Sequence, residues 1–361
     1  MIRTGSMHNR GRKGLVRLFA FLCAFGVVQV LVGEAKQVDI PVEEYGMIVS
    51  RDMQAIKGAT VEKVRLYSPE SANSSKKIVR HGVLVRYKDA VGTLLLCHGF
   101  MCDKTDENFL RRLVPKGRFN VMSFDFRAHG ENKEGQCCTL GRDEAYDVIT
   151  AAHFLRSHPS LKGKPVFVYG FSMGAVASIE AQSKDSSLFD AMILDCPFDS
   201  SENVIKRGLE NLKITLFGYT FDLPGKSLLQ RYAFHPYVQS MLKMVLKVIA
   251  KFDSHDIILH ALPTFPVQSI VNVTVPTFLI HCKNDEKVSV DAVTSIFNNS
   301  GATNKTLWLT NGRGHYDSFF YNPEGYTEKV RKFLEDAING TLRATRKKEM
   351  IVDKQEAPLE G

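Results

Sequence analysis

Apolar residues occur along the chain mainly in short runs that are separated by longer segments with helical spacing. The runs are bounded by Gly, Pro or Asp, and they read GTLLLCHG, FNVMSFDF, PVFVYGF, DAMILDCPF, PTFLIHCKND and TLWLT. Short continuous apolar runs are typical of strands that are buried on both faces. Two earlier segments, VEKVRLYS and VRHGVLVRY, predict a hairpin-type pair of strands that precedes them.

Helical patterns lie between these runs. In residues 140–157, Ala145, Val148, Ala152 and Leu155 recur at the spacing of one helix face. Similar patterns cover residues 106–116, 173–184, 288–298 and 326–339. Strands and helices that alternate in this way predict an α/β fold with a mainly parallel central sheet and helices on both faces.

One interval, about residues 199–273, is far longer than a usual connection between elements. We expect it to form an inserted helical cap. Its segment QSMLKMVLKVIAKF is amphipathic, with Lys243, Lys247 and Lys251 on one side. The favoured interpretation is a helix of the insertion with its lysines in water, and the alternative is a helix that lies on an anionic membrane surface.

The chain has 361 residues, of which 44% are hydrophobic and 24% charged, as in ordinary globular proteins. Its formal net charge is +8, but residues 1–35 hold five basic residues and one acidic residue, which leaves +4 on the remainder. No dense basic stripe with interleaved aromatic residues is present, so nucleic-acid binding is set aside. We expect a main domain over residues 36–340 and a charged, flexible tail over residues 341–361. The oligomeric state is left open.

The N-terminus combines basic residues with the apolar stretch LFAFLCAFGVVQVLVG, residues 18–33, followed by Glu34 and Ala35. A basic start, an apolar centre and small residues at the end are typical of a secretory signal peptide. A membrane-spanning helix needs about 20 residues, so this stretch is short for one. The sequence therefore predicts export, to the periplasm or the medium, with an uncleaved N-terminal membrane anchor as the alternative.

The cysteines after the leader fall into two groups. Three lie in or at the end of apolar runs, where small buried side chains are expected: Cys97, Cys196 and Cys282. Three lie in loop-like stretches, and a disulfide from the first to either of the others would suit an oxidising compartment: Cys102, Cys137 and Cys138. Neither a CxxC pair nor a His/Cys cluster has zinc spacing, so no metal site is expected.

The stretch VYGFSMGAVAS places Ser172 between Gly170 and Gly174, where an apolar run meets a helical pattern. A strand that runs directly into a helix needs a very sharp turn, and glycines remove the side chains that would collide there. Ser172 would then lie at the apex of the turn. The start of the following helix directs free N–H groups toward it.

A serine hydroxyl becomes a good nucleophile only when a base removes its proton, and a carboxylate must orient that base. Asp285 follows the run TFLIHC, and His315 lies in the glycine-containing loop after TLWLT. Both loops should open on the same sheet edge as Ser172, in the chain order Ser, Asp, His. The rivals for the base are His281, His255 and His260, and those for the acid are Glu286 and Asp195.

The stretch LLLCHGFMC ends another run at His98 and Gly99. A glycine there lets the backbone approach a substrate closely, so the N–H of Phe100 and the N–H of Met173 form a candidate oxyanion hole. His98 is expected to have a structural role.

These motifs together resemble the α/β-hydrolase superfamily of serine hydrolases, over roughly residues 61–339. HGF at 98–100 resembles the oxyanion loop, GFSMGA the nucleophile elbow, KNDEKV the acid loop and GRGHYDSF the histidine loop. FDFRAHGEN is similar to the superfamily stretch D-x-R-G-H-G-x-S, with Ala128 in place of a glycine and Asn132 in place of the serine. The most similar subgroup contains lysophospholipase-like and serine-aminopeptidase-like hydrolases with modest helical caps. The resemblance implies hydrolysis without a cofactor.

The sequence thus predicts cleavage of a carboxylic ester or thioester through an acyl-enzyme, on a small-molecule or lipid-like acyl substrate. Three alternatives stay open: a peptidase on the same scaffold, an acyl-protein thioesterase at a membrane, and a binding protein without turnover.

Overall fold

The fold is given by a computed structural model. The structure describes residues 58–106, 113–131, 135–210, 259–344 and 347–354, together with the short segments 29–31, 213–216 and 219–222 and single residues between 227 and 238.

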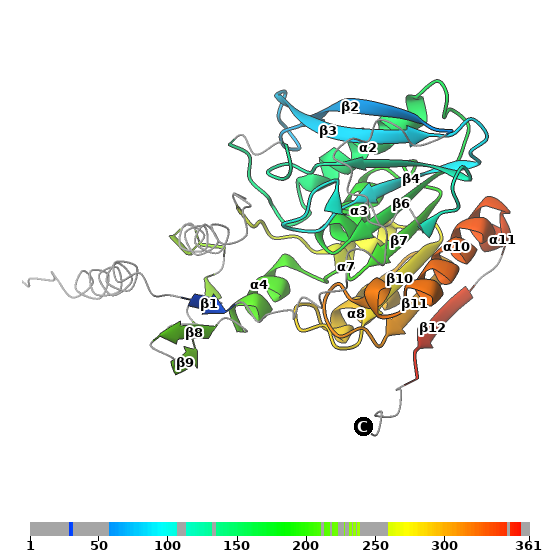
Figure 1. Ribbon diagram of the computed structural model, residues 1–361. Helices are drawn as coiled ribbons and strands as arrows, with labels where there is room; N and C mark the ends of the chain where they lie inside the picture. The colour runs from blue at the N-terminus through cyan, green and yellow to red at the C-terminus, as the bar shows by residue number, and fades with distance from the viewer. Residues whose placement is uncertain are drawn as a thin grey trace, which may run out of the picture.

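The centre of the molecule is a nine-stranded sheet with the strand order β12-β11-β10-β7-β6-β4-β5-β3-β2 (Figure 1). β3 pairs antiparallel with β2 and β5, and all other neighbours are parallel. The predicted α/β class and the opening hairpin are therefore confirmed. The strands are β2 (Thr60–Pro69), β3 (Lys77–Arg86), β4 (Gly92–Cys97), β5 (Phe119–Phe124), β6 (Val166–Phe171), β7 (Ala191–Asp195), β10 (Thr277–Cys282), β11 (Asn304–Thr310) and β12 (Lys347–Val352).

Helices cover both faces of this sheet. In β4, Leu95 packs into one apolar cluster with residues of α2, α3 and α8, whereas Leu94 and Leu96 pack into a second cluster with residues of α10. Both faces are thus buried, which explains the continuous apolar runs. The helices are α2 (Glu144–Ser157), α3 (Met173–Lys184), α4 (Ser201–Glu210), α7 (Pro266–Ser269), the 3₁₀ helix η2 (Ile270–Asn272), α8 (Val290–Asn299), α9 (Ser318–Tyr321), α10 (Pro323–Ile338) and α11 (Thr341–Ala344). Most of the helix expected over 106–116 lies outside the described residues.

The prediction of a flexible tail over residues 341–361 is wrong for its first part. That part forms α11 and then β12, which extends the sheet by pairing with β11 over six residues. Trp308 Nε1 donates to Asp353 Oδ1 at 2.8 Å, and Lys283 Nζ donates to the Asp353 carbonyl at 2.7 Å. The strand was not recognised in the sequence because the segment is charged and lacks a continuous apolar run. As an edge strand, it is held by its backbone pairing with β11.

The long insertion contains strands as well as helices. After α4, the described segments β8 (Lys213–Leu216) and β9 (Tyr219–Asp222) pair antiparallel, and β1 (Gln29–Leu31) adds to β8. The basic helix expected around Lys243 to Lys251 lies outside the described residues, as does the leader apart from β1. Among the helices that the structure describes, none has the length and apolar character that a membrane crossing requires. Export and membrane anchoring stay predictions.

All six cysteines in the described part of the chain are thiols, so the expected disulfide of Cys102 is not formed. Cys138 is fully buried, and its Sγ lies 3.4 Å from Met173 Sδ. The side chain of Cys138 therefore packs in the core beneath the start of α3. Cys97, Cys196 and Cys282 are buried, as their positions in apolar runs indicate.

A buried ion pair ties the loop after β5 to helix α2. Arg127 Nη2 donates to Asp147 Oδ1 at 2.8 Å and Arg127 Nε donates to Oδ2 at 3.1 Å, while the same guanidinium donates to the carbonyls of Pro69 and Glu70. Burial opposes the charge of Asp147, but the charge and hydrogen bonds of Arg127 outweigh it and lower the pKa of Asp147. One arginine thus links the end of β2, the loop after β5 and α2.

We expect Asp147→Asn to lower the free energy of unfolding by about 3–5 kcal/mol, because the charge of Arg127 stays buried without its counter-ion. Urea unfolding followed by circular dichroism measures this change. Because the folded-state pKa of Asp147 lies below the ordinary 3.8, the stabilisation is complete above that pH and is lost as the pH falls through the folded-state value. The difference between wild type and variant should therefore shrink in acid. The matched control is Asp143→Asn, half-buried on the preceding turn, and an equal loss in both variants would contradict the assignment.

Candidate active site

The turn between β6 and α3 is as sharp as the sequence predicts. Ser172 is the single residue between them, and its backbone adopts φ 47° and ψ −111°, a strained conformation for a residue with a side chain. A Cβ at Gly174 would collide with the carbonyl oxygen of Cys97, and one at Gly170 would lie 2.6 Å from Ala175 Cα. Both positions therefore require glycine, and Ser172 is held at the apex.

Three residues that are far apart in the sequence form a continuous hydrogen-bond chain at the carboxyl edge of the sheet. Ser172 Oγ lies 2.9 Å from His315 Nε2, and His315 Nδ1 lies 2.6 Å from Asp285 Oδ2. A carboxylate can only accept, so Nδ1 carries the proton and Nε2 is left to accept the serine hydroxyl. This is the tautomer that a general base requires.

The second oxygen of Asp285 is fixed by its own loop. Oδ1 accepts from the backbone N–H groups of Lys287, at 2.8 Å, and Val288, at 2.9 Å. Burial would raise the pKa of Asp285, but the hydrogen bond and charge of His315 and then the charge of His281 lower it overall. Asp285 is therefore an ionised, immobilised acceptor at neutral pH.

Asp195, one of the two rivals for the acid, is hydrogen-bonded to groups other than His315. Its Oδ2 accepts from the hydroxyls of Tyr169, at 3.0 Å, and Tyr326, at 2.6 Å, and its Oδ1 accepts from Cys196 Sγ. Burial raises the pKa of Asp195. The other rival, Glu286, is exposed beside Asp285. Of these three carboxylates, Asp285 is the one hydrogen-bonded to His315.

The rival histidines lie elsewhere. His281 is buried in β10, its Nε2 donates to the Val288 carbonyl at 3.2 Å, and burial lowers its pKa to about 4. His281 therefore supports the loop that carries Asp285. His260 is exposed, and His255 lies outside the described residues.

The loop that carries Phe100 is braced by two buried histidines. His98 Nε2 accepts from the N–H of Phe126 at 3.0 Å, and His129 Nε2 accepts from the N–H of Met101 at 3.3 Å. Each ring donates through Nδ1 to a carbonyl, of Gly99 and Arg127 respectively. Burial, followed by the neighbouring His129, lowers the pKa of His98 to about 3, so it stays neutral. The brace by His98 agrees with its predicted structural role.

The two expected oxyanion donors face the same edge. Phe100 follows β4 in a turn closed by the Cys102 N–H and the Gly99 carbonyl, and Met173 begins α3. Gly174 packs against the carbonyls of Cys97 and His98, which brings the two segments together. In the part of the chain that the structure describes, neither N–H donates to another protein group.

Sequence reasoning missed several residues around this site. His129 was visible only as a member of the FDFRAHGEN stretch, and its contact with Met101 crosses from one loop to another. Phe171 places its ring 5.5 Å from His315 and 4.0 Å from Tyr316, centroid to centroid. Cys196 was expected only as a buried residue, yet its Sγ lies within 4.8 Å of ligand atoms of Asp285 and His315. No spacing in the sequence indicates that these residues lie close together, because they come from the ends of different strands.

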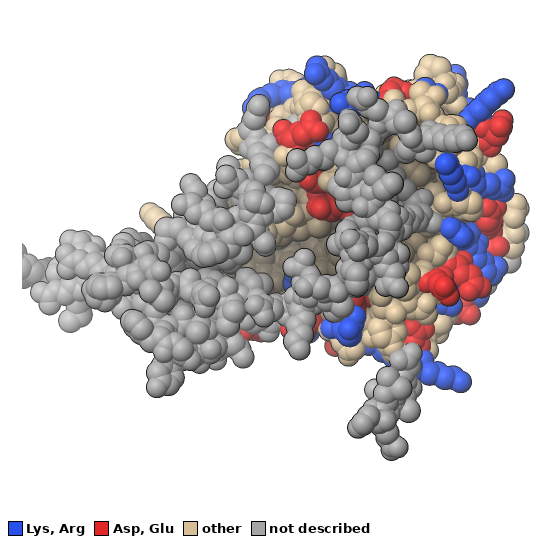
Figure 2. Space-filling view, in the orientation of Figure 1, with Lys and Arg blue, Asp and Glu red and all other residues tan. Residues whose placement is uncertain are grey.

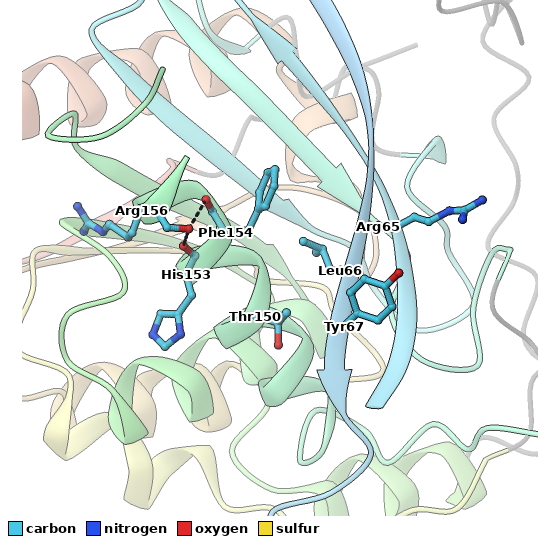
Figure 3. A pocket seen from close by; sticks show the side chains of 8 residues that line it. Arg65, Leu66, Tyr67, Thr150, His153, Phe154 and Arg156 are labelled. Carbon is cyan, nitrogen blue, oxygen red and sulfur yellow. Dashed lines mark hydrogen bonds between the residues drawn. The ribbon is translucent and has the colours of Figure 1, made fainter. Parts of the chain in front are cut away.

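A groove of about 560 Å³ lies away from this site, between β2 and α2 (Figure 3). Its lining includes Arg65, Tyr67 and Phe154. The last turn of α2 lies at the opposite edge of the sheet from Ser172, since Arg156 Nη2 binds Asp190 just before β7 begins. On the face shown in Figure 2, acidic and basic side chains of the described residues are interspersed.

A model of the alpha/beta hydrolase family matches residues 94–329, and the chain therefore belongs to this family. It is 23% identical over 261 residues to the uncharacterized protein YqkD of Bacillus subtilis, which is 72% of this chain and 76% of that protein. It is 24% identical over 248 residues to the alpha/beta hydrolase domain-containing protein aho-3 of Caenorhabditis elegans, which is 67% of this chain and 57% of that one.

Solved structures share the fold. The Pyrococcus furiosus esterase Pf2001 superposes with a TM-score of 0.57 at 20% identity, covering 78% of this chain and 93% of that one. A 2,6-dihydroxy-pseudo-oxynicotine hydrolase superposes with a TM-score of 0.55 at 13% identity, covering 80% and 71%. The architecture around Ser172 is thus that of a family of hydrolases.

We expect Asp285→Asn to lower kcat by about 10³–10⁴-fold, because the carboxamide no longer fixes the proton on His315 Nδ1. The matched control is Asp195→Asn, which should stay within about tenfold of wild type because Asp195 does not bind the base. Steady-state hydrolysis of an activated ester by both folded variants gives the comparison. Equal losses of kcat in the two variants, or a larger loss in Asp195→Asn, would contradict the assignment of Asp285 as the acid.

Proposed function

We propose that the protein is a serine hydrolase that cleaves carboxylic esters or thioesters through an acyl-enzyme intermediate, with Ser172 as nucleophile, His315 as base and Asp285 as orienting acid. The observation that carries this proposal is the continuous chain of hydrogen bonds from Ser172 Oγ through His315 to Asp285. A protein that only binds a ligand gains nothing from a strained serine aligned with a base.

In the acylation step, His315 Nε2 takes the proton of Ser172 while Oγ attacks the carbonyl carbon. The N–H groups of Phe100 and Met173 are the proposed donors to the oxygen that becomes negative, and each such donor contributes about 10²–10³-fold in rate. Asp285 stabilises the imidazolium. His315 then gives the proton to the leaving group, and water repeats the sequence on the acyl-enzyme to release the acid.

The surroundings of His315 favour an apolar group in the substrate. The ring of Phe171 lies 5.5 Å from that of His315 and 4.0 Å from that of Tyr316, centroid to centroid, and is tilted against both. Tyr316 contacts Phe320, which is 38% exposed. These rings give one wall of the site an apolar surface at the carboxyl edge. An ester or thioester fits the site better than an amide, because its leaving group needs less protonation. The esterases among the structures of similar fold agree with this choice.

Two segments outside the main sheet bear on how the proposed site is covered and on where the protein acts. The insertion over residues 199–273 begins directly after β7, beside the loops that carry the three residues, which suits a cap over the site. Residues 1–35 have the composition of an export signal or membrane anchor. The proposed enzyme is therefore exported, or held at a membrane by its N-terminal segment, and acts on a small-molecule or lipid-like acyl substrate without a cofactor.

Labelling with a fluorophosphonate probe tests the nucleophile. We expect the wild type to be labelled and Ser172→Ala to be unlabelled, because the probe bonds only to an activated serine oxygen. Ser178→Ala is the matched control: Ser178 is a buried serine one turn into α3 that donates to the Gly174 carbonyl, and its variant should label like wild type. An unlabelled, folded wild type would contradict the proposed activity. A series of p-nitrophenyl esters of increasing acyl length then measures the substrate preference through kcat/KM.

A further inference from the structure

Cys196 is a buried thiol beside the hydrogen-bonded chain, and the ester hydrolysis mechanism does not use it. Its Sγ, a carboxylate oxygen of Asp285 and a ring nitrogen of His315 all lie within 4.8 Å of one another. Each comes from a loop that follows a different strand: β7, β10 and β11. The sheet therefore assembles a cluster of three different donors that no local motif contains.

The backbone holds Cys196 in place. The residue has φ 51°, a left-handed conformation that is uncommon for a residue with a side chain, and its N–H donates to the Ile280 carbonyl at 2.9 Å. Its thiol donates to Asp195 Oδ1 at 3.2 Å. The side chain is thus fixed at the sheet edge under His315.

A thiolate, an imidazole nitrogen and a carboxylate oxygen are the ligands that Zn²⁺ takes in proteins. In a tetrahedral zinc site these atoms lie about 3.3–3.8 Å apart, given metal–ligand distances of about 2.0–2.3 Å. The present separation of His315 Nδ1 and Asp285 Oδ2 is 2.6 Å, and the others reach at most 4.8 Å. Side-chain shifts of about 1 Å would bring all three to zinc distances, with a fourth position open for water.

We propose that Cys196, Asp285 and His315 form an inhibitory site for Zn²⁺ at the base of the catalytic chain. The inhibition rests on the proposed function, whereas the metal site does not. Zinc would take the place of the proton on His315 Nδ1, and the proton would move to Nε2, so that the ring stays neutral. That nitrogen then donates and can no longer accept the proton of Ser172.

The charges and protons of this step balance. The Cys196 thiol releases one proton to solvent, and the two negative charges of its thiolate and of Asp285 neutralise the dication. Mg²⁺ and Ca²⁺ prefer oxygen ligands, so neither binds a set with one sulfur and one nitrogen at comparable concentration. The inhibition is therefore selective for borderline or soft cations and is reversed by a chelator.

Direct binding is measured on Ser172→Ala, which keeps all three ligands but lacks the nucleophile. In equilibrium dialysis we expect it to bind about one zinc ion per chain more than Ser172→Ala/Cys196→Ala, which lacks one ligand. Co²⁺ added to Ser172→Ala should give a near-ultraviolet thiolate-to-cobalt band. Equal zinc binding by the two proteins overturns the site. A cobalt spectrum of Ser172→Ala without that band also overturns it, and this measurement does not require a stable Cys196→Ala variant.

Inhibition is measured on proteins with the nucleophile, each compared with its own metal-free rate. At a zinc concentration that inhibits the wild type about tenfold, Cys196→Ala should lose most of the inhibition. The matched control is Cys97→Ala, which should keep it, because Cys97 is a buried cysteine at the end of β4 on the same sheet edge and is not one of the proposed ligands. Equal inhibition of the two variants overturns the proposal. A metal-free wild type without esterase activity contradicts the proposed function alone, because the dialysis and cobalt measurements do not depend on turnover.

Discussion

The close approach of helix α3 to the end of β4 is the contact on which the site depends. Gly174 lies against the carbonyls of Cys97 and His98 with no space for a Cβ, so the helix begins directly behind the loop that carries Phe100. The same approach forces Ser172 into its strained backbone conformation. Strain of this kind costs about 1–3 kcal/mol and persists only where the surrounding structure enforces it. Here the sheet and α3 enforce it together.

Buried polar contacts hold the loops around this turn at fixed distances. His98 and His129 accept backbone N–H groups from each other's loops, and Asp125 accepts from both the backbone and the side chain of Lys104. Asp285 receives two N–H groups from its own loop, and His281 binds the carbonyl of one of those residues. The proposed catalytic side chains lie on loops, but each loop is attached to a strand end by several hydrogen bonds. Such a scaffold is pre-organised before any substrate binds.

Most strands of the main sheet could be predicted from the sequence, because strands buried on both faces leave continuous apolar runs. The position of Ser172, Asp285 and His315 at one edge of the sheet could be predicted as well. The sequence was insufficient where backbone pairing or long-range packing decides the structure. β12 carries charged and polar positions and is recognised only by its partner β11. The hairpin β8–β9 lay in a segment expected to be helical. The position of Cys196 under His315 depends on the order of β7, β10 and β11 in the sheet, which no local spacing contains.

The pairing of β12 with β11 has a consequence for the order of folding during synthesis. β12 follows the other described strands of this sheet in the chain and is made after them, yet it covers the edge of β11, whose backbone would otherwise be available to other chains. Until residues 347–352 have been made, β11 is the edge strand of the sheet on this side, although its side chains are mostly buried in the folded protein. β11 leads directly into the loop that carries His315. Pairing with β12 therefore removes an open sheet edge of the kind that favours association between newly made chains.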